Sequence, residues 1–304
     1  MVGCHQAPRP DTVHCVDLAY LRAHPTHLPT FLKHQRIRTT PVSGGSICTA
    51  ERLTLDDGAD VFAKSLSDPP EGFFAAEAAG LRWLGEACPE LVPEVIAETG
   101  DMLVLEWLEA GEPTTAAAER LGRALATLHR RGADSFGAPW RGYIGTLPLD
   151  NTPSQGPWAT WFAERRLTPY LRMSVDNGTF DVSEANVIDR VIERIDRLAP
   201  PEEPPSRLHG DLWPGNVLWG GDDRVWLVDP AAHGGHRETD LALLALFGGP
   251  PHLDRVIAAY QEVHPLPDGW RERVPLHQLH LLLVHTALFG TAYRSAVLNA
   301  AAQL

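Results

Sequence analysis

Residues 207–230 constrain the fold more than any other stretch of this chain. They read RLHGDLWPGNVLWGGDDRVWLVDP. Two short apolar runs, at 217–219 and 225–228, flank the turn-forming sequence Gly-Gly-Asp-Asp. This pattern predicts a loop that leads into a tight β-hairpin. The loop carries Asp211 and Asn216, and Asp229 ends the second strand, so one rigid frame would present all three polar side chains.

These three side chains could supply a general base and two oxygen ligands for magnesium. Protein kinases use the same residue types, with a catalytic-loop Asp as the base and an Asn and a later Asp on the metal. We therefore expect Asp211 to be the base, and Asn216 and Asp229 to hold Mg²⁺. A calcium loop is a rival, but the spacing lacks the alternation and terminal Glu of an EF-hand. Ordinary turn residues are the remaining alternative.

Short runs of β-branched and apolar residues dominate the first third of the chain. They predict three strands, one helix and two further strands, at 37–42, 47–55, 61–66, 72–87, 94–98 and 102–107. Glycine- and aspartate-rich turns separate the strands. The expected result is a five-stranded antiparallel sheet with one key helix.

Helical periodicity takes over after a boundary at Glu109–Pro113. We expect helices at 115–131, 157–172, 182–198, 239–247, 253–263 and 270–298. The fold class is then α+β, with two lobes as in protein kinases. Residues 1–108 would form an ATP-binding lobe, including an extension at 1–30 without assigned chemistry. Residues 109–304 would form a mainly helical catalytic and substrate lobe.

Lys64 lies where an apolar side chain is expected, on the strand face that it shares with Phe62 and Leu66. A buried lysine needs a partner. Glu77 is the candidate, because it falls on the apolar stripe of the following helix, four residues before Leu81. Such a strand-lysine and helix-glutamate pair positions the ATP phosphates in kinases. A solvent-facing lysine on an edge strand is the alternative.

The turn formed by Ser43, Gly44, Gly45 and Ser46 joins the first two strands, where kinases place the loop over the phosphates. Glycine lets backbone N–H groups approach an anion closely. The turn is not a full GxGxxG sequence, and a Gly-Gly hairpin turn is the common alternative. Cys48 follows it, and we expect a buried, inert thiol there rather than a reactive one.

The end of the fifth strand is the expected adenine site, where kinases use backbone groups at positions such as Glu106 and Leu108. A core strand with a linker is the alternative. His209, two residues before Asp211, would support the loop. Asp240 could brace the loop or cap a helix, and capping is the favoured interpretation.

Charge and cysteine content narrow the class of partner. A net charge of −13 argues against a nucleic-acid surface, since phosphate binding needs a basic face. No apolar run approaches the roughly 20 residues that span a bilayer, and the N-terminus lacks the apolar core of a signal peptide. Four cysteines without CxxC spacing indicate a cytoplasmic protein without zinc or disulfides. We expect a small-molecule partner, no nucleic acid and no membrane; a monomer is compatible with the sequence, which leaves the oligomeric state open.

Four longer segments carry a family resemblance. They are HGDLWPGN at 209–216, VDPAAHGGHRETDLALLALFGG at 228–249, WATWF at 158–162 and HTALFGTAY at 285–293. Together they resemble the fructosamine kinase family, also called ketosamine-3-kinases, within the aminoglycoside phosphotransferase-like group. The first loop is shared across that group, whereas Trp213 and the pair Asp229–Pro230 are more diagnostic. The resemblance spans about residues 43–294.

The resemblance implies ATP-dependent phosphorylation of the 3-hydroxyl of a ketosamine, the product of a sugar with an amine. The 3-phosphate is unstable and releases the amine, so the family serves in deglycation. By the same resemblance, Lys64 and Glu77 position the phosphates, Asp211 is the base and Trp213 lies against the sugar. A tryptophan face could stack on sugar C–H groups or attract an ammonium. A core aromatic is the alternative for Trp213.

Some positions depart from related patterns. Gly210 stands where protein kinases have Arg, Pro230–Ala231 replaces Phe-Gly, and Pro214 takes a position that is usually small and polar. Two other functions stay open. One is phosphorylation of another hydroxylated amine, such as an aminoglycoside, choline or homoserine. The other is a catalytically silent nucleotide-binding regulator, which the intact Lys64 and Asp211 disfavour.

Overall fold

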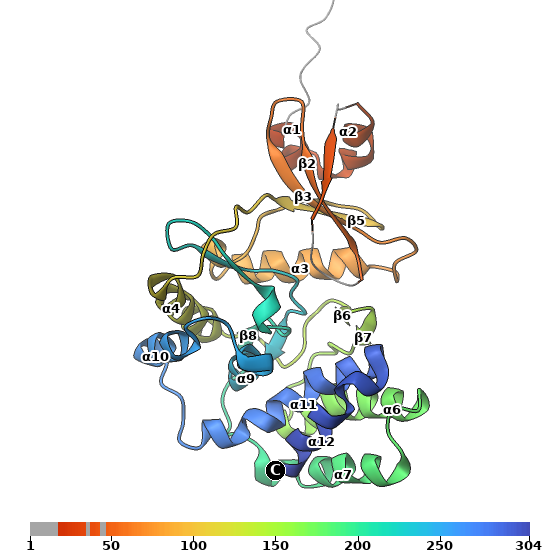
Figure 1. The fold of residues 1–304 in the computed structure, drawn as a ribbon, viewed down its shortest axis with the longest axis vertical. Coiled ribbons are helices and arrows are strands. Elements are labelled where there is room, and N and C mark those ends of the chain that lie inside the picture. Colours follow the sequence, from red (N-terminus) through yellow and green to blue (C-terminus); the bar gives the residue numbers. More distant parts are fainter. Residues whose placement is uncertain (1–17, 35–36, 43–46) are drawn as a thin grey trace, which may run out of the picture.

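The computed structural model of the protein describes residues 18–34, 37–42 and 47–304. A strand-rich lobe stands above a larger helical lobe, and the chain passes from one to the other after Glu106 (Figure 1). The two-lobed α+β arrangement predicted from the sequence is confirmed.

The N-terminal lobe contains a five-stranded antiparallel sheet in the order β1-β2-β3-β5-β4. The strands are β1 (Arg38–Pro41), β2 (Thr49–Thr54), β3 (Asp60–Ser65), β4 (Val95–Glu98) and β5 (Met102–Glu106). The flanking helices are α1 (Leu18–Ala23), α2 (Leu28–His34) and α3 (Phe73–Gly85). The helix expected between the third and fourth strands is α3.

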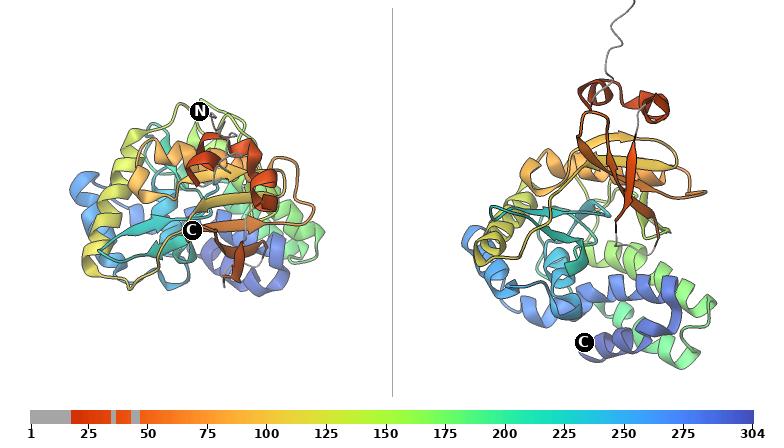
Figure 2. Two further views of the ribbon diagram at one scale, coloured as in Figure 1. Left: turned by 90° about the horizontal axis from the view of Figure 1, so that it is seen from above. Right: turned by 45° about the horizontal axis from the view of Figure 1, so that its top comes forward.

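Both faces of the sheet are covered, because side chains alternate along each strand. Leu103 and Leu105 of β5 pack in the same apolar cluster as α3, whereas Val104 joins the cluster on the other face. Leu21 and Leu28 of the N-terminal helices complete that second cluster. In Figure 2 these helices lie on the far side of the sheet from the helical lobe.

Helix α3 lies against the helical lobe as well as against the sheet. Phe74, Ala78 and Leu81 are fully buried, and Glu77 lies among them. A Cβ atom placed on Gly80 would lie 3.0 Å from the Cβ of Ala232, so glycine permits this close approach. The packing fixes α3 relative to the residues that follow the hairpin.

Helices dominate the C-terminal lobe. They are α4 (Thr115–Arg131), α5 (Trp158–Phe162), α6 (Thr168–Asp176), α7 (Val182–Glu193), α8 (Ile195–Leu198), α9 (Glu238–Leu244), α10 (Leu253–Val263), α11 (Trp270–Phe289) and α12 (Arg294–Ala302). The lobe also has three strand pairs, β6 (Gly142–Ile144) with β7 (Leu147–Leu149), β8 (Ser206–Leu208) with β11 (His233–Gly235), and β9 (Val217–Trp219) with β10 (Val225–Leu227). The pairs β6–β7 and β8–β11 were not predicted from the sequence.

Three predicted helices are interrupted. Residues 157–172 form α5, a π-helical turn at Ala163–Leu167 and then α6. Residues 182–198 break at Arg194 between α7 and α8. The helix expected to reach residue 298 ends at Phe289, because Gly290 takes a φ of +67° and a short 3₁₀ turn follows.

The stretch Trp270–Ala302, which spans α11 and α12, is by length and composition long and apolar enough to cross a membrane. The expectation that no run approaches this length is therefore corrected. Length and composition alone are weak support for a membrane span. In this fold α11 packs on α9 and α6, and its buried His277 and His280 bond to Thr239 and to the carbonyl of Arg166. These contacts are those of a core helix.

Candidate active site

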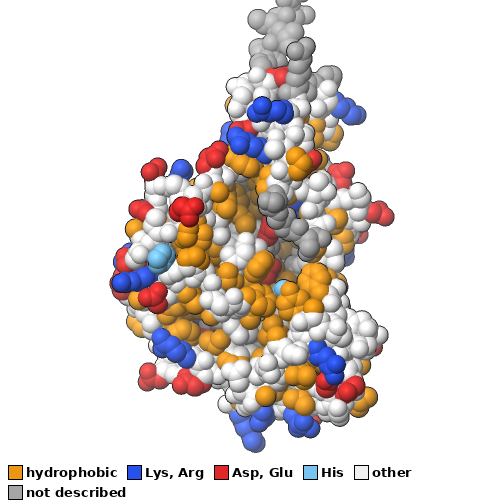
Figure 3. Space-filling model, viewed as in Figure 1, with side chains coloured by type: hydrophobic (Ala, Val, Ile, Leu, Met, Phe, Trp, Pro, Cys, Tyr) orange, Lys and Arg blue, Asp and Glu red, His pale blue; other side chains and the backbone are white. Residues whose placement is uncertain are grey.

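A cavity of about 1030 Å³ lies between the lobes. Figure 3 shows the hollow on this face, with hydrophobic side chains around it and acidic side chains inside it. The cavity brings together all the described residues to which the sequence assigned chemistry, namely Lys64, Glu77, Glu106, Leu108, Asp211, Trp213, Asn216 and Asp229.

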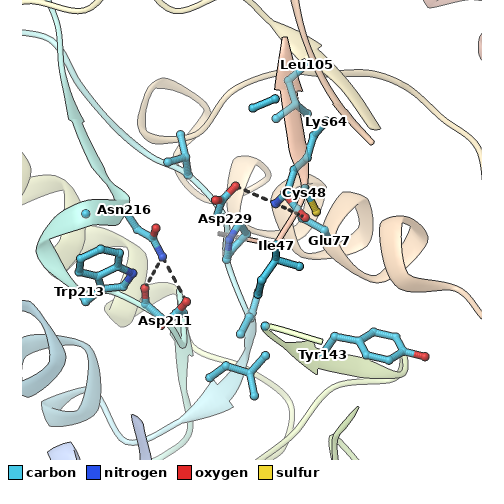
Figure 4. Close-up of a pocket in the computed structure, with 18 of the residues that line it drawn as sticks. Ile47, Cys48, Lys64, Glu77, Leu105, Tyr143, Asp211, Trp213, Asn216 and Asp229 are labelled. Carbon is cyan, nitrogen blue, oxygen red and sulfur yellow. Dashed lines mark hydrogen bonds and ion pairs between the residues drawn. The ribbon is translucent and has the colours of Figure 1, made fainter. Parts of the chain in front are cut away.

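Lys64 links the two lobes. Its Nζ lies 2.9 Å from Oε2 of Glu77 on α3 and 2.9 Å from Oδ1 of Asp229 after the hairpin (Figure 4). Only 12% of the Lys64 side chain is exposed, so the solvent-facing alternative is wrong. Burial lowers the pKa of Lys64, but the two carboxylates outweigh burial and raise it, so the ammonium stays charged.

Asp211 is a half-buried residue whose carboxylate has one buried, unengaged oxygen. Its Oδ2 accepts a hydrogen bond from Nδ2 of Asn216 at 3.2 Å, whereas its Oδ1 has no partner in the described part of the chain. Burial, followed by the nearby charge of Asp229, raises the pKa of Asp211 to about 8. A carboxyl group whose pKa is raised in this way, on a residue that lines a cavity, has the properties of a general base.

The predicted hairpin presents Asn216 and Asp229 to the cavity. Strands β9 and β10 pair antiparallel, and the N–H of Val228 donates to the carbonyl of Asn216 at 3.0 Å. Asp229 follows in a left-handed backbone conformation with a φ of 55°. This conformation is uncommon outside glycine and clusters at functional sites.

The donor atoms of Asn216 and Asp229 fit a magnesium ion. Nδ2 of Asn216 donates to Asp211, which leaves the amide oxygen for another partner. Oδ1 of Asp229 accepts from Lys64, which leaves Oδ2. Two oxygen ligands beside a cavity suit Mg²⁺, which binds few protein groups and completes its shell with water and phosphate.

Asp240 braces the loop that carries Asp211. Its carboxylate accepts hydrogen bonds from the backbone N–H groups of His209 at 2.8 Å and Gly210 at 2.9 Å. Nε2 of His129 on α4 lies 3.2 Å from the same carboxylate. Helix capping, the interpretation favoured from the sequence, is therefore wrong. A separation of about thirty residues, with no local signal, hid this contact from sequence reasoning.

The loop conformation also explains Gly210 in place of the kinase Arg. Gly210 has a φ of +82°, and a Cβ atom there would lie 2.2 Å from the carbonyl oxygen of Ala231. His209 supports the loop as expected, since its Nε2 donates to the carbonyl of Val228 at 3.0 Å.

Of the residues expected to contact the nucleotide, the structure describes some and not others. Glu106 and Leu108 line the cavity, and the N–H of Glu106 already donates to the carbonyl of Glu94 at 3.0 Å. Ser43, Gly44, Gly45 and Ser46 lie outside the described residues. Cys48 lines the cavity and is only half-buried, but burial raises the pKa of its thiol, which agrees with an inert cysteine.

The fructosamine kinase family profile matches residues 26–304. The chain belongs to the fructosamine kinase family. It is accordingly a phosphotransferase that acts on a hydroxyl group, as the sequence resemblance implied.

Relatives of this fructosamine kinase family member cover most of its length. A protein of Enterococcus faecium named probable ketoamine kinase is 35% identical over 265 residues, which cover 86% of this chain and 92% of the relative. A solved structure from Thermobifida fusca YX-ER1, provisionally named fructosamine-3-kinase, is 45% identical with a TM-score of 0.85, over 93% of this chain and 98% of that one. A macrolide 2'-phosphotransferase from Brachybacterium faecium shares the fold at 18% identity, with a TM-score of 0.55 over 87% and 91% of the two chains.

Sequence reasoning missed a group of rings that continues outward from Trp213 in this fructosamine kinase family member. We call it the ring cluster, and it comprises Trp213, Phe247, His285, Phe289 and Tyr293. Three of its members recur every four residues, a helical spacing that could have predicted one shared face.

Proposed function

We propose that this protein is an ATP-dependent kinase that phosphorylates the 3-hydroxyl group of a ketosamine. The observation that carries the proposal is Asp211, a half-buried residue that lines the same cavity as Lys64 and whose Oδ1 has no partner among the described residues. Phosphoryl transfer requires a group that orients the attacking hydroxyl and a cation that holds the phosphates. Family membership supports a ketosamine as the acceptor.

Each side chain has one task in this proposal. Asp211 accepts the proton of the attacking hydroxyl, a role that contributes about 10²–10⁴-fold in rate. Lys64, oriented by Glu77, binds phosphate oxygens. Asn216 and Asp229 would hold Mg²⁺, which neutralises negative charge on the phosphoryl group when it is bound.

Each lobe would bind one of the two substrates. Residues 1–108 would bind ATP, with the adenine at Glu106 and Leu108 and the phosphates under the loop Ser43–Ser46. The N–H of Glu106 is engaged, so its carbonyl is the group left for the adenine amine. Residues 109–304 would bind the ketosamine, with Trp213 against the sugar.

The chemistry of the proposed product indicates a role in removing sugars from glycated amines. A ketosamine 3-phosphate decomposes and frees the amine, so the activity would reverse glycation of small amines or of protein side chains. The substrate is then a small molecule or a glycated side chain in the cytoplasm, with no nucleic acid or membrane involved. Every residue that the proposal assigns a task belongs to one chain, so the proposed reaction does not require an oligomer.

A substrate panel tests the proposal. The protein is incubated with Mg-ATP and ribulosamines, fructosamines, an aminoglycoside, choline and homoserine, and the phosphate is located by ³¹P–¹H NMR. Phosphate on the ketosamine 3-hydroxyl supports the proposal. Preference for another hydroxylated amine would replace the substrate. ATP consumption equal to that of the Asp211→Asn variant would favour a silent nucleotide-binding protein.

A further inference from the structure

Four members of the ring cluster line the cavity, namely Trp213, His285, Phe289 and Tyr293, and Phe247 joins them through ring contacts. The rings of Trp213 and Phe247 lie 6.3 Å apart, and Phe247 lies 5.7 Å from the ring of His285. His285 is in turn 4.6 Å from Tyr293 and 5.7 Å from Phe289. The contacts form one continuous aromatic surface that starts beside the base.

Two members of the cluster are unusual in their exposure. Phe247 is 52% exposed and Phe289 is 45% exposed, whereas the other seven phenylalanines of the chain are buried or half-buried. Phe247 also has a φ of 56°, a strained conformation for a bulky residue. Strain of this kind persists where the surrounding structure enforces it, commonly at ligand sites. Exposed rings held in place beside a cavity indicate an apolar ligand group.

The cavity offers no free cation to an anionic ligand group. Among the described residues that line it, Lys64 is the one Lys or Arg side chain, and it is held by Glu77 and Asp229. Arg294, next to the cluster in sequence, is paired with Glu184 at 2.8 Å. A carboxylate on the ligand would meet acids and rings instead.

His285 does not supply the missing charge. Its Nδ1 donates to the carbonyl of Leu281 at 2.7 Å, so the other ring nitrogen carries the lone pair. Burial lowers the pKa of His285, which keeps the ring neutral at physiological pH. The neutral ring suits a ligand ammonium or an apolar group.

We propose that the ring cluster is the subsite for the amine-derived substituent of the ketosamine, and that it selects uncharged apolar or aromatic substituents over those that carry a carboxylate. This inference rests on the proposed function. The ketosamine ammonium would lie between Asp211 and the rings, which attract a cation through their faces. Ketosamines of free amino acids would then be poor substrates, because their carboxylate has no partner.

The inference is tested by the steady-state kinetics of three ketosamines, which share one sugar and differ in the amine. Ketosamines are prepared from benzylamine, propylamine and glycine, and kcat/KM is measured for each with Mg-ATP. We expect the benzylamine compound to exceed the propylamine compound about tenfold, the value of one additional buried aromatic contact, and the glycine compound to be slowest. Phe289→Ala should reduce the benzylamine-to-propylamine ratio toward one. Val182→Ala, which alters an exposed apolar residue on α7, is the control and should keep the ratio.

Binding supplies a readout that does not depend on turnover. Saturation-transfer NMR on the benzyl protons should show contact in the wild type and a weaker signal in Phe289→Ala. If the glycine compound is the best substrate, or if Phe289→Ala leaves the ratio unchanged, the subsite is wrong while the kinase activity stands. If none of the three is phosphorylated, the proposed function fails and the subsite fails with it.

Discussion

Nζ of Lys64 lies 2.9 Å from Oδ1 of Asp229, although 165 positions separate the two residues in sequence. This contact joins β3 of the upper lobe to the end of the hairpin in the lower lobe. The same ammonium is held by Glu77 of α3, so one cation fixes three elements around the cavity. The two lobes are thus joined by one ammonium group, at the place to which the proposed function assigns the ATP phosphates.

Replacement of this cation should separate its catalytic role from its structural role. Lys64→Met should reduce kcat/KM by at least about 100-fold, because the side-chain cation that is proposed to bind the phosphate oxygens would be lost. The substitution should also lower the free energy of unfolding. The loss should be smaller than the ~3–5 kcal/mol that follows when one partner of a fully buried ion pair is removed, since the cavity admits water to the remaining carboxylates. Steady-state kinetics and urea unfolding measure the two effects.

The double variant Lys64→Met/Glu77→Gln is the matched control. Removal of the second charge should recover most of the lost stability and none of the activity. Activity regained along with stability would assign Lys64 a structural role alone.

The raised pKa of Asp211 predicts a pH dependence of both rate and stability. The base works when deprotonated, so kcat/KM should rise with pH on the acid side, with an apparent pKa well above 3.8. For stability, a carboxyl whose pKa is raised on folding favours the fold at low pH, and this contribution is lost as pH rises toward 8. Asp211→Asn should therefore lose about 10²–10⁴-fold in rate and should gain stability relative to the wild type between pH 4 and 8.

A different outcome would reassign this residue. If Asp211→Asn keeps its activity, or if the wild-type rate is flat from pH 5 to 8, another group is the base. Thermal melts of both proteins across this range check the stability part independently.

Asp240 should act by positioning the catalytic loop. In Asp240→Asn the side chain can accept fewer hydrogen bonds, so one of the N–H groups of His209 and Gly210 loses its partner. We expect kcat to fall while KM changes little, because Asp240 is fully buried and does not line the cavity. Hydrogen exchange should show faster exchange of the two amides, and a loss of rate without that change would contradict a positioning role.

Glu238 should make the protein sensitive to acid. Burial raises the pKa of Glu238, but the two-point contact with Arg273, at 2.7 and 2.8 Å, and the neighbouring His277 outweigh burial and lower it to about 2. The stabilisation is present above the ordinary pKa of 4.5 and is lost as pH falls toward 2. Glu238→Gln should cost ~3 kcal/mol at pH 7 and much less near pH 2, as measured by urea unfolding.

Glu119→Gln is the control for this experiment, because Glu119 forms an exposed pair with Arg123 on α4. It should change stability by no more than about 0.5 kcal/mol at either pH. An equal loss in both variants would show that net charge, rather than the buried pair, governs acid stability.

The sequence predicted those parts of the fold whose signals are local. Period-two apolar residues and glycine turns predicted the sheet and the hairpin, and a helical stripe placed Glu77 on the buried face that Lys64 also meets. Contacts made at long range were missed or misread. Asp240 had a plausible local role as a cap, and its true partners lie about thirty residues earlier in the chain.

The ring cluster illustrates the same limit. His285, Phe289 and Tyr293 carry a visible spacing, but only the break of α11 at Gly290 turns Tyr293 back toward the other rings. Phe247 joins them because its backbone is left-handed, and no local sequence pattern predicts this conformation for a phenylalanine. Such conformations depend on the packing of the whole lobe.

The position of the transferred phosphate decides whether this protein phosphorylates the 3-hydroxyl group of a ketosamine. A fructosamine is incubated with the protein and Mg-ATP, and the product is followed by ³¹P–¹H correlation NMR as it forms. The account predicts a phosphate coupled to the proton on carbon 3, absent with Asp211→Asn, followed by release of the free amine. Phosphate on any other hydroxyl, or the same product from Asp211→Asn, would contradict it.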